Sequence, residues 1–241
     1  MSVHGHGGTW LNVFGPEYTK INTVWERDER GVIRLESYST PEIAYLADKR
    51  WYWYEKVDGT NIRLHWNGKV VTVGGREDNA QLPSRLVANM GQQGHYAPEL
   101  WRDVFPDCTD ATVYGEGYGA GIRSGGNYGQ HQWFIVFDVN VGGWWLTQSN
   151  VEDVAVKLGF DVVPFVGDHS ISDAWKGLRD GIISSAWPDC PIEGLVGRPG
   201  VDLYTRKGER IITKMKVSDH RDWLKNKERL AKLAKDAERT D

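Results

Sequence analysis

The sequence predicts an α+β domain in which mixed, mainly antiparallel sheets are flanked by helices. Three observations predict it. The chain has 241 residues, enough for a sizeable core, and its 12 Trp and 28 Gly suit strands and tight turns. Apolar and polar residues alternate in runs between Trp51 and Val73. A continuous apolar run with a single aspartate follows at Trp133–Val139, which is typical of a buried strand.

Three β-type runs lie close together, at residues 51–57, 62–66 and 69–73. Alternation in the first run places Tyr52, Tyr54 and Lys56 on one face of a strand. Asp58-Gly59 and Asn67-Gly68 separate the runs, and both dipeptides are strong hairpin signals. Three antiparallel strands are therefore expected here. Upstream signals are weak, with a short strand or loop near 18–24 and a turn at 30–31.

The remaining elements follow from caps and periodicity. Ser149 and Ser170 each precede an acidic residue by three positions, as in capping boxes, and Ser218 is a candidate N-cap for a last helix. Helices are expected at 83–90, 97–104, 150–158, 172–180 and from 218 onward. Further strands are expected at 111–118, 133–139, 160–166, 193–196 and 209–217.

Composition excludes several classes of protein. No apolar run approaches the roughly 20 residues of a membrane span, and the start of the chain has no signal-peptide pattern, so we expect a cytoplasmic protein without membrane association. Cys108 and Cys190 lie far apart and form no CxxC pair, which argues against a disulfide scaffold and a zinc site. Ordinary fractions of hydrophobic and charged residues, 40% and 26%, fit a soluble globular protein.

Charge is unevenly distributed along the chain. The formal net charge is −4, yet residues 206–239 hold 12 Lys and Arg against 6 Asp and Glu. A local basic surface on an acidic protein suits a polyanionic ligand, such as nucleotide phosphate or a nucleic-acid backbone. The same residues also fit a solvated amphipathic helix, and the charge pattern does not decide between the two.

Lys56 is the most informative single residue. It begins the segment Lys56–Asn61, just after an aromatic strand. The lysine could simply precede a hairpin turn at Asp58-Gly59, or it could be a nucleophile. A free lysine has a pKa of about 10.4 and is a poor nucleophile near neutrality. A catalytic lysine therefore needs neighbours, such as other cations, that disfavour its ammonium form.

Five segments in order resemble the motifs of the covalent nucleotidyltransferase superfamily of polynucleotide ligases and capping enzymes. They are Lys56–Asn61, Tyr114–Gly117, Phe134–Asp138, Glu193–Val196 and Lys214–Lys216. The Gly-Thr-Asn ending of the first motif is similar to that of the second RNA-ligase type of bacteriophages. The resemblance implies an ATP-grasp-like adenylyltransferase domain whose cofactors are ATP and Mg²⁺ or Mn²⁺.

The resemblance also implies a role for each matching residue. Lys56 is the nucleophile that carries AMP, and Lys214 and Lys216 stabilise phosphate charge. Glu193 is the expected ligand of the divalent metal ion. The expected nucleotide contacts are Glu55 to the adenine amine, Glu116 to the ribose, Phe134 by base stacking, Arg76 to phosphate or ribose, and Asp58, Gly59 and Asn61 within the first motif.

Each of these residues also has a plain structural interpretation. The two lysines could be solvated residues of a strand edge, Glu193 a surface carboxylate, and Phe134 a core aromatic. Asp58 is the choice of ligases in general, whereas the phage RNA-ligase type often has histidine there. The role of that histidine is therefore not implied for this chain.

In DNA ligases and capping enzymes a further domain follows the last motif, whereas this chain ends soon after it. Only 24 residues follow Val217, so we expect residues 1–217 to form the adenylation domain, 218–241 a basic helix, and no C-terminal OB domain to follow. A partner protein could supply the missing substrate-binding domain.

The resemblance implies a phage-like RNA ligase of the RNA-repair kind, which joins 5′-phosphate and 3′-hydroxyl ends through lysyl-AMP. Strand ends of DNA or of an RNA/DNA hybrid are the other expected partners. A minimal DNA ligase or a guanylyltransferase on the same domain is the nearest alternative. A non-catalytic nucleic-acid-binding module is a third, which the set of Lys56, Glu193, Lys214 and Lys216 disfavours because a binder has no need of it.

Overall fold

A computed structural model describes residues 13–123 and 128–238, with side chains as far as residue 233. The described chain forms two compact units. Unit 1 comprises residues 13–18, 59–123 and 131–162, and unit 2 comprises residues 19–58, 128–130 and 163–238. Both units combine helices with mainly antiparallel sheets, which confirms the predicted α+β class.

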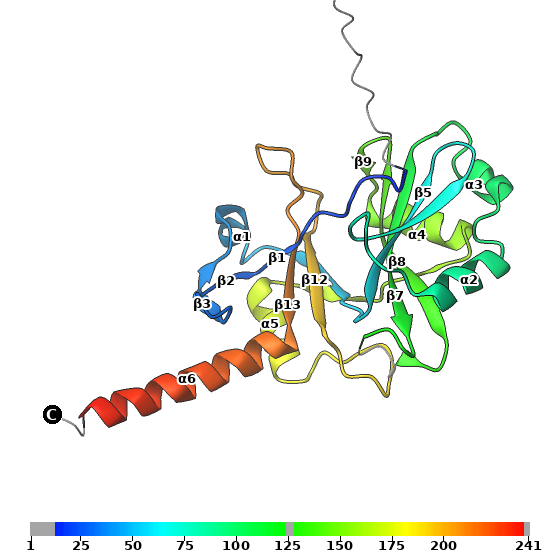
Figure 1. The fold of residues 1–241 in the computed structure, drawn as a ribbon. Coiled ribbons are helices and arrows are strands. Elements are labelled where there is room, and N and C mark those ends of the chain that lie inside the picture. Colours follow the sequence, from blue (N-terminus) through cyan, green and yellow to red (C-terminus); the bar gives the residue numbers. More distant parts are fainter. Residues whose placement is uncertain (1–12, 124–127, 239–241) are drawn as a thin grey trace, which may run out of the picture. The chain divides into compact units, whose positions relative to one another are not determined.

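Unit 1 is built on a six-stranded sheet. Its strand order is β10 (Asp161–Val162), β8 (Gln132–Val141), β7 (Ala111–Gly119), β5 (Thr60–Trp66) and β6 (Val71–Gly75), and β9 (Trp144–Trp145) pairs with β8. Three helices cover one face of this sheet, α2 (Ser84–Gln92), α3 (Pro98–Val104) and α4 (Gln148–Lys157) (Figure 1). Alternate residues of β5, such as Ile62 and Leu64, are fully buried beneath them in a first core.

The opposite face of this sheet is covered by residues 14–18. Tyr18 packs against the rings of Tyr114, Phe137 and Trp145, and its hydroxyl donates a hydrogen bond of 2.8 Å to Asp138. The Tyr114 hydroxyl donates in turn to the Pro16 carbonyl oxygen at 2.8 Å. The N-terminal segment therefore buries the polar face of β5 and β7 without adding a strand to the sheet.

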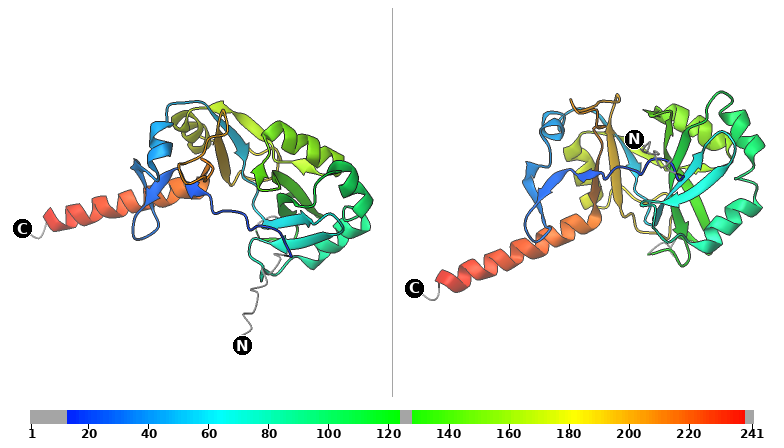
Figure 2. Two further views of the ribbon diagram at one scale, coloured as in Figure 1. Left: turned by 90° about the horizontal axis from the view of Figure 1, so that it is seen from above. Right: turned by 45° about the horizontal axis from the view of Figure 1, so that its top comes forward.

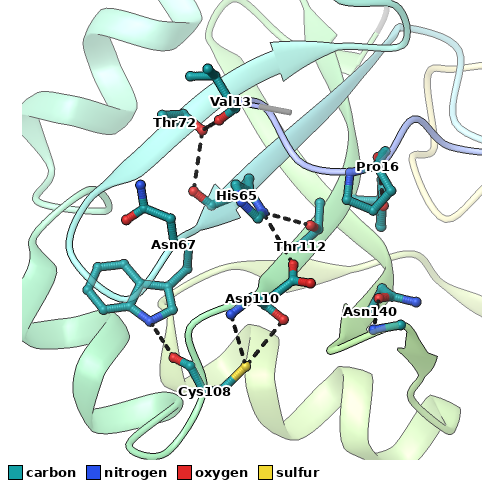
Figure 3. A network of polar contacts seen from close by, with 12 residues as sticks. Val13, Pro16, His65, Asn67, Thr72, Cys108, Asp110, Thr112 and Asn140 are labelled. Carbon is teal, nitrogen blue, oxygen red and sulfur yellow. Dashed lines mark hydrogen bonds and ion pairs between the residues drawn. The ribbon is translucent and has the colours of Figure 1, made fainter. Parts of the chain in front are cut away.

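His65 lies on this covered face, within the polar network of Figure 3. One ring nitrogen, Nδ1, is 3.0 Å from the Thr112 hydroxyl and 3.9 Å from a carboxylate oxygen of Asp110. Burial lowers the pKa of His65 from its usual 6.5, and this effect exceeds the opposing effect of Asp110. The folded protein therefore holds a neutral imidazole at pH values where the unfolded chain is already protonated.

We expect the free energy of unfolding to fall as the pH drops below about 6.5, because the unfolded state then binds a proton that the folded state accepts only at lower pH. The loss should level off below the lowered pKa of His65. Urea unfolding between pH 5 and 8 measures it, and His65→Gln should flatten the profile, whereas replacing the exposed His131 by Gln should not. An unchanged profile in His65→Gln would contradict this assignment.

Unit 2 contains a five-stranded sheet, a two-stranded ribbon and three helices. The sheet has the order β1 (Asn22–Thr23), β13 (Thr213–Lys216), β12 (Gly194–Pro199), β4 (Trp51–Glu55) and β11 (Phe165–His169), and the ribbon pairs β2 (Trp25–Arg27) with β3 (Ile33–Tyr38). The helices are α1 (Pro41–Tyr45), α5 (Ile171–Arg179) and α6 (Val217–Glu238). Trp51, Trp53, Leu195 and Met215 enter a second core on one face of the sheet.

The last helix, α6, begins directly after β13 and extends away from the strands of unit 2, as both views of Figure 2 show. Leu224, Leu230 and Leu233 are exposed along it. The boundary expected at residue 217 does not coincide with a boundary between the two units, because α6 follows β13 within unit 2. Within the described residues, no helix combines the length and hydrophobicity needed to cross a membrane.

Several predicted elements are confirmed, among them the hairpin at Asn67-Gly68, the helices α2 and α3, and the Ser170 cap, whose hydroxyl accepts from the Asp173 amide at 3.1 Å. The hairpin expected at Asp58-Gly59 is wrong, because β4 pairs with β11 and β12 while β5 pairs with β6 and β7. Alternation identifies a strand but not its neighbours, so the sequence could not separate these two.

Three further boundaries differ from expectation. The apolar run 160–166 is divided between two short strands of different sheets, β10 and β11. Thr147, and not Ser149, occupies the N-cap position of α4. Ser218 lies inside α6, whose first turn is instead capped by Asp219, which accepts a hydrogen bond of 3.1 Å from the Lys216 amide. The short strands and helix between residues 22 and 45 gave no clear signal in the sequence.

Candidate active site

Lys56, Glu193 and Lys216 form one cluster in unit 2. The Lys56 ammonium donates to one carboxylate oxygen of Glu193 at 2.7 Å, and the Lys216 ammonium donates to the other at 2.6 Å. The three side chains are partly exposed, at 21%, 18% and 33%, so solvent and a ligand can reach them. The single carboxylate of Glu193 thus forms ion pairs with two ammonium groups, and the cluster has a net positive charge that suits a phosphate.

The backbone around Gly194 explains this arrangement. Gly194 lies between Lys56 and Lys216, because its carbonyl oxygen accepts from the Lys56 amide at 3.0 Å and it is the antiparallel partner of Lys216. It has no side chain to fill the space between the two lysines, and an added Cβ would come within 2.1 Å of the Met215 carbonyl oxygen. Glu193, immediately before β12, can therefore reach both ammonium groups.

Lys214 shares the face of β13 that carries Lys216. The residue between them, Met215, is fully buried in the second core, so strand alternation directs both lysines to the opposite face. Lys214 is the antiparallel partner of Val196 in β12. The two predicted charge-stabilising lysines are therefore brought to the same face as Lys56.

Glu55 has a structural task in unit 2. Its side chain is only 2% exposed, and its carboxylate accepts hydrogen bonds from the Ser185 hydroxyl at 2.6 Å and the Ala186 amide at 2.8 Å. Glu55 therefore anchors the loop that carries Ser185 and Ala186. A carboxylate can accept more than two hydrogen bonds, so the expected contact to an adenine amine stays a prediction.

Asp58 is held by its backbone. Its amide donates to the Tyr128 hydroxyl at 2.9 Å, and the Tyr128 ring packs edge-on against Trp187 at 5.0 Å. Burial raises the pKa of both the Tyr128 phenol and the nearby Cys190 thiol above their usual ranges. The raised pKa makes the Cys190 thiol a weaker candidate nucleophile than a free cysteine would be.

In unit 1, three motif residues come together at one end of β5 and β7. Asn61 is the antiparallel partner of Glu116, and both side chains are half-buried. The buried Asn61 Oδ1 has no hydrogen-bond partner among the described residues. Gly59 packs so closely that an added Cβ would lie 2.2 Å from the Gly117 carbonyl oxygen. Asn61 thus presents an acceptor that a ligand could satisfy.

Arg76 is exposed in the turn that follows β6. Two residues later, Asp78 forms an ion pair with Arg63, whose side chain is fully buried on β5. The Asp78 amide also donates to Glu17 at 3.3 Å. These contacts fix the turn that carries Arg76, and neither Arg63 nor Asp78 was expected to matter from the sequence.

Phe134 is a core residue of unit 1. It is 5% exposed, belongs to the first core and packs edge-on against Phe160 at 5.0 Å. The half-buried Phe137 lies on the opposite face, against Tyr18. The two residues are three positions apart, so strand alternation places them on opposite faces. Val136 pairs with Gly115 and Asp138 with Tyr114, so Phe137 is also the extra residue of a β-bulge.

The face of the sheet matters for the choice of aromatic residue. Glu116 lies between Gly115, which faces the Phe134 ring, and Gly117, which faces Leu86 of α2, so Glu116 points away from the first core. Phe137, unlike Phe134, shares that side of the sheet. Strand alternation from Phe134 is consistent with this placement, but the sequence alone did not show which face carries Glu116 and which face is the core.

The described side chains are those of residues 13–123 and 128–233. Among them, no three or more His, Cys, Asp or Glu residues lie together as a metal site. Glu193 nevertheless fits a Mg²⁺-like ion, because such ions are commonly held by one or two carboxylates together with substrate phosphates and water. Its carboxylate is accessible and hard, and its present partners are two ammonium groups that phosphate oxygens could also bind.

The family model described as RNA ligase matches residues 49–230, which contain every residue of this cluster. The chain belongs to the RNA ligase family. No curated protein matches it in sequence. Among solved structures it resembles variants of the RNA ligase of Naegleria gruberi, one with ATP and Mn and another with AMP and Mn. TM-scores are 0.61 and 0.59, and sequence identity is 15% for both.

The alignments cover 88% and 87% of this chain but only 60% and 58% of those RNA ligases. At this identity the likeness shows a shared fold. The family and the fold agree with the resemblance of the five sequence motifs, and the chain spans about 60% of the length of the solved relatives.

Proposed function

We propose that this member of the RNA ligase family is an ATP-dependent RNA ligase that works through a covalent lysyl-AMP intermediate. The observation that carries the proposal is the bridging of Lys56 and Lys216 by Glu193 on one sheet face, beside Lys214. A lone lysine would be unremarkable there. A lysine beside two further cations and a metal-competent carboxylate has what transfer of a nucleotidyl group needs.

In the first step the Lys56 amine attacks the α-phosphorus of ATP. The new bond is N–P, the bond from the α-phosphorus to the bridging oxygen breaks, and pyrophosphate leaves. The amine must first lose a proton, and Glu193, at 2.7 Å, is the group in contact with it. Lys214 and Lys216 would bind the phosphate oxygens as charge develops on them.

In the second step an oxygen of a strand's 5′-phosphate attacks the same phosphorus, so that the N–P bond breaks and Lys56 is regenerated. In the third step a 3′-hydroxyl attacks the activated 5′-phosphate and AMP leaves. Glu193 would hold a divalent ion, Mg²⁺ or Mn²⁺, which when bound supplies positive charge to the phosphates. The Mn in the solved relatives supports this part of the proposal.

The nucleotide contacts proposed in unit 1 follow from its polar end. Glu116 would accept from ribose hydroxyls, and the unsatisfied Asn61 Oδ1 would accept from the bound nucleotide. Arg76 remains the proposed phosphate or ribose contact. For base stacking we propose Phe137 in place of Phe134, because it lies on the side of the sheet to which Glu116 points.

The test of the reaction type is the mass of the purified protein after incubation with ATP and Mg²⁺ or Mn²⁺. An increase by one AMP, followed by mapping of the modified peptide to Lys56, is the expected result. A protein that binds RNA but never gains AMP would instead be a nucleic-acid-binding module on this fold.

The sugar at the 3′ end should distinguish an RNA ligase from a minimal DNA ligase. We expect pre-adenylylated protein to seal a strand with a 3′-terminal ribose faster than the matched strand with deoxyribose, because the 2′-hydroxyl is the group by which a protein recognises RNA. Single-turnover sealing of strands that differ only in that sugar measures the preference. Equal or faster sealing of the all-DNA substrate would favour the DNA ligase.

A further inference from the structure

We infer that the polynucleotide binds along the same face of the five-stranded sheet that carries Lys56, with the exposed rings of Phe165 and Tyr52 stacking on its bases. This inference rests on the proposed function and names the surface that receives the strand. We call the surface formed by the exposed rings of Tyr52 and Phe165, which lie over the buried Tyr54, the aromatic face.

The register of the sheet places the aromatic face next to the lysine cluster. Phe165 of β11 is the antiparallel partner of Tyr54 in β4, and Arg198 of β12 is the partner of Tyr52. Trp51 and Trp53 enter the second core, so alternation turns Tyr52, Tyr54 and Lys56 to the opposite face. Successive residues on one face of a strand lie about 7 Å apart, so Tyr54 and Tyr52 lead directly away from Lys56.

The rings are exposed and yet held in place. Phe165 is 56% exposed and Tyr52 is 38% exposed. The Phe165 ring centroid lies 5.4 Å from that of Tyr54 and 6.0 Å from that of Tyr52, both in tilted or edge-on contacts. Apolar rings fixed on a strand and left open to solvent are a ready platform for bases, whose flat faces stack without regard to sequence.

The charge of this side of the sheet favours a polyanion over a protein or a lipid. Lys56, Lys214 and Lys216 all lie on it, and Glu193 is the one carboxylate that pairs with both Lys56 and Lys216. A further carboxylate, Asp168, is the partner of Tyr52, and it already forms an ion pair with Arg50. Aromatic rings interleaved with cations are the usual composition of surfaces that bind single strands.

The surface continues beyond the strands into residues 200–212, the loop between β12 and β13 that extends from the end of the sheet in Figure 1. The Gly200 amide donates to the Arg50 carbonyl oxygen at 3.0 Å, which ties the loop to the start of β4. Tyr204 is 47% exposed within it. From Lys56 to Arg50 the extended chain spans about 20 Å, so the loop lies at the far end of β4 from the nucleophile.

The experiment measures binding of a fluorescent, 5′-phosphorylated single-stranded RNA by anisotropy, without ATP or metal. Phe165→Ala and Phe165→Leu are compared with the wild type, because leucine keeps an apolar side chain but lacks a π-face. Loss of one stacked base should weaken binding about fivefold to a hundredfold in both variants. Phe165→Trp should restore it. The slope of affinity against salt should stay unchanged, because no phosphate contact is lost.

Tyr45→Ala is the matched control, because Tyr45 is an aromatic residue that is 80% exposed. It ends α1, a helix whose Ile43 packs into the second core, and therefore lies away from the aromatic face. It should bind RNA as the wild type does. Equal affinities of Phe165→Ala and Tyr45→Ala would overturn the inference, and so would failure of the wild type to bind RNA, which would leave a protein as the occupant. Formation of the AMP adduct is measured separately on the wild type. If the wild type gains no AMP but still binds RNA through Phe165, the proposed ligase function is refuted and the proposed RNA-binding surface is supported.

Discussion

Lys56→Ala is expected to abolish the AMP adduct completely. The Lys56 side chain supplies the only atom that bonds to phosphorus in the proposed first step, and it directly follows the aromatic strand at the start of the first motif. Incubation with ATP and Mg²⁺ or Mn²⁺, followed by intact-mass analysis, measures the adduct. In the wild type the adduct should be acid-labile and alkali-stable, as a phosphoramidate is.

Two further variants sharpen this test. Lys56→Arg keeps a cation beside Glu193 but offers no nucleophile, since a guanidinium stays protonated, so it should also lack the adduct while retaining stability. Lys49→Ala removes an exposed lysine of the same unit that pairs with Asp48, and it should gain AMP normally. An adduct of undiminished yield on Lys56→Ala would refute the assignment of the nucleophile.

Lys214→Ala and Lys216→Ala are each expected to slow formation of the adduct by about 10²–10³-fold, equivalent to roughly 3–4 kcal/mol of transition-state stabilisation. Both lysines lie on the face of β13 opposite the second core, so their loss leaves no cavity and should change the free energy of unfolding little. Single-turnover adenylylation measures the rate, and urea unfolding checks the stability.

Lys225→Ala, on the exposed surface of α6, is the matched control and should react at the wild-type rate. Lys216→Arg should recover part of the lost rate, because it restores a positive charge beside Glu193. Wild-type rates in both alanine variants would identify Lys214 and Lys216 as solvated residues of the strand and would reopen the interpretation as a binding module.

The sequence predicted the lysine cluster because its chemistry depends on residue types in a fixed order. Lys56, Glu193 and Lys216 were assigned roles from their motifs, and the fold brings them within hydrogen-bonding distance. The prediction was weaker where a role depends on the side of a strand. Phe134 and Phe137 are both plausible aromatics of one motif, and only the tertiary structure shows that Phe134 packs in the first core while Phe137 lies on the opposite face against Tyr18.

What the sequence determined by itself was the α+β class, most of the longer strands and helices, and the residues able to carry nucleotidyl chemistry, because these depend on local periodicity and on side-chain type. Pairing was decided by the tertiary structure. Strands β4 and β5 are separated by only a few residues, including Asp58-Gly59, yet enter different sheets, because their apolar residues belong to two separate cores. Contacts between distant parts of the chain also join the Glu55 carboxylate to the Ser185 hydroxyl and place Phe165 beside Tyr54. No local sequence pattern encodes either contact.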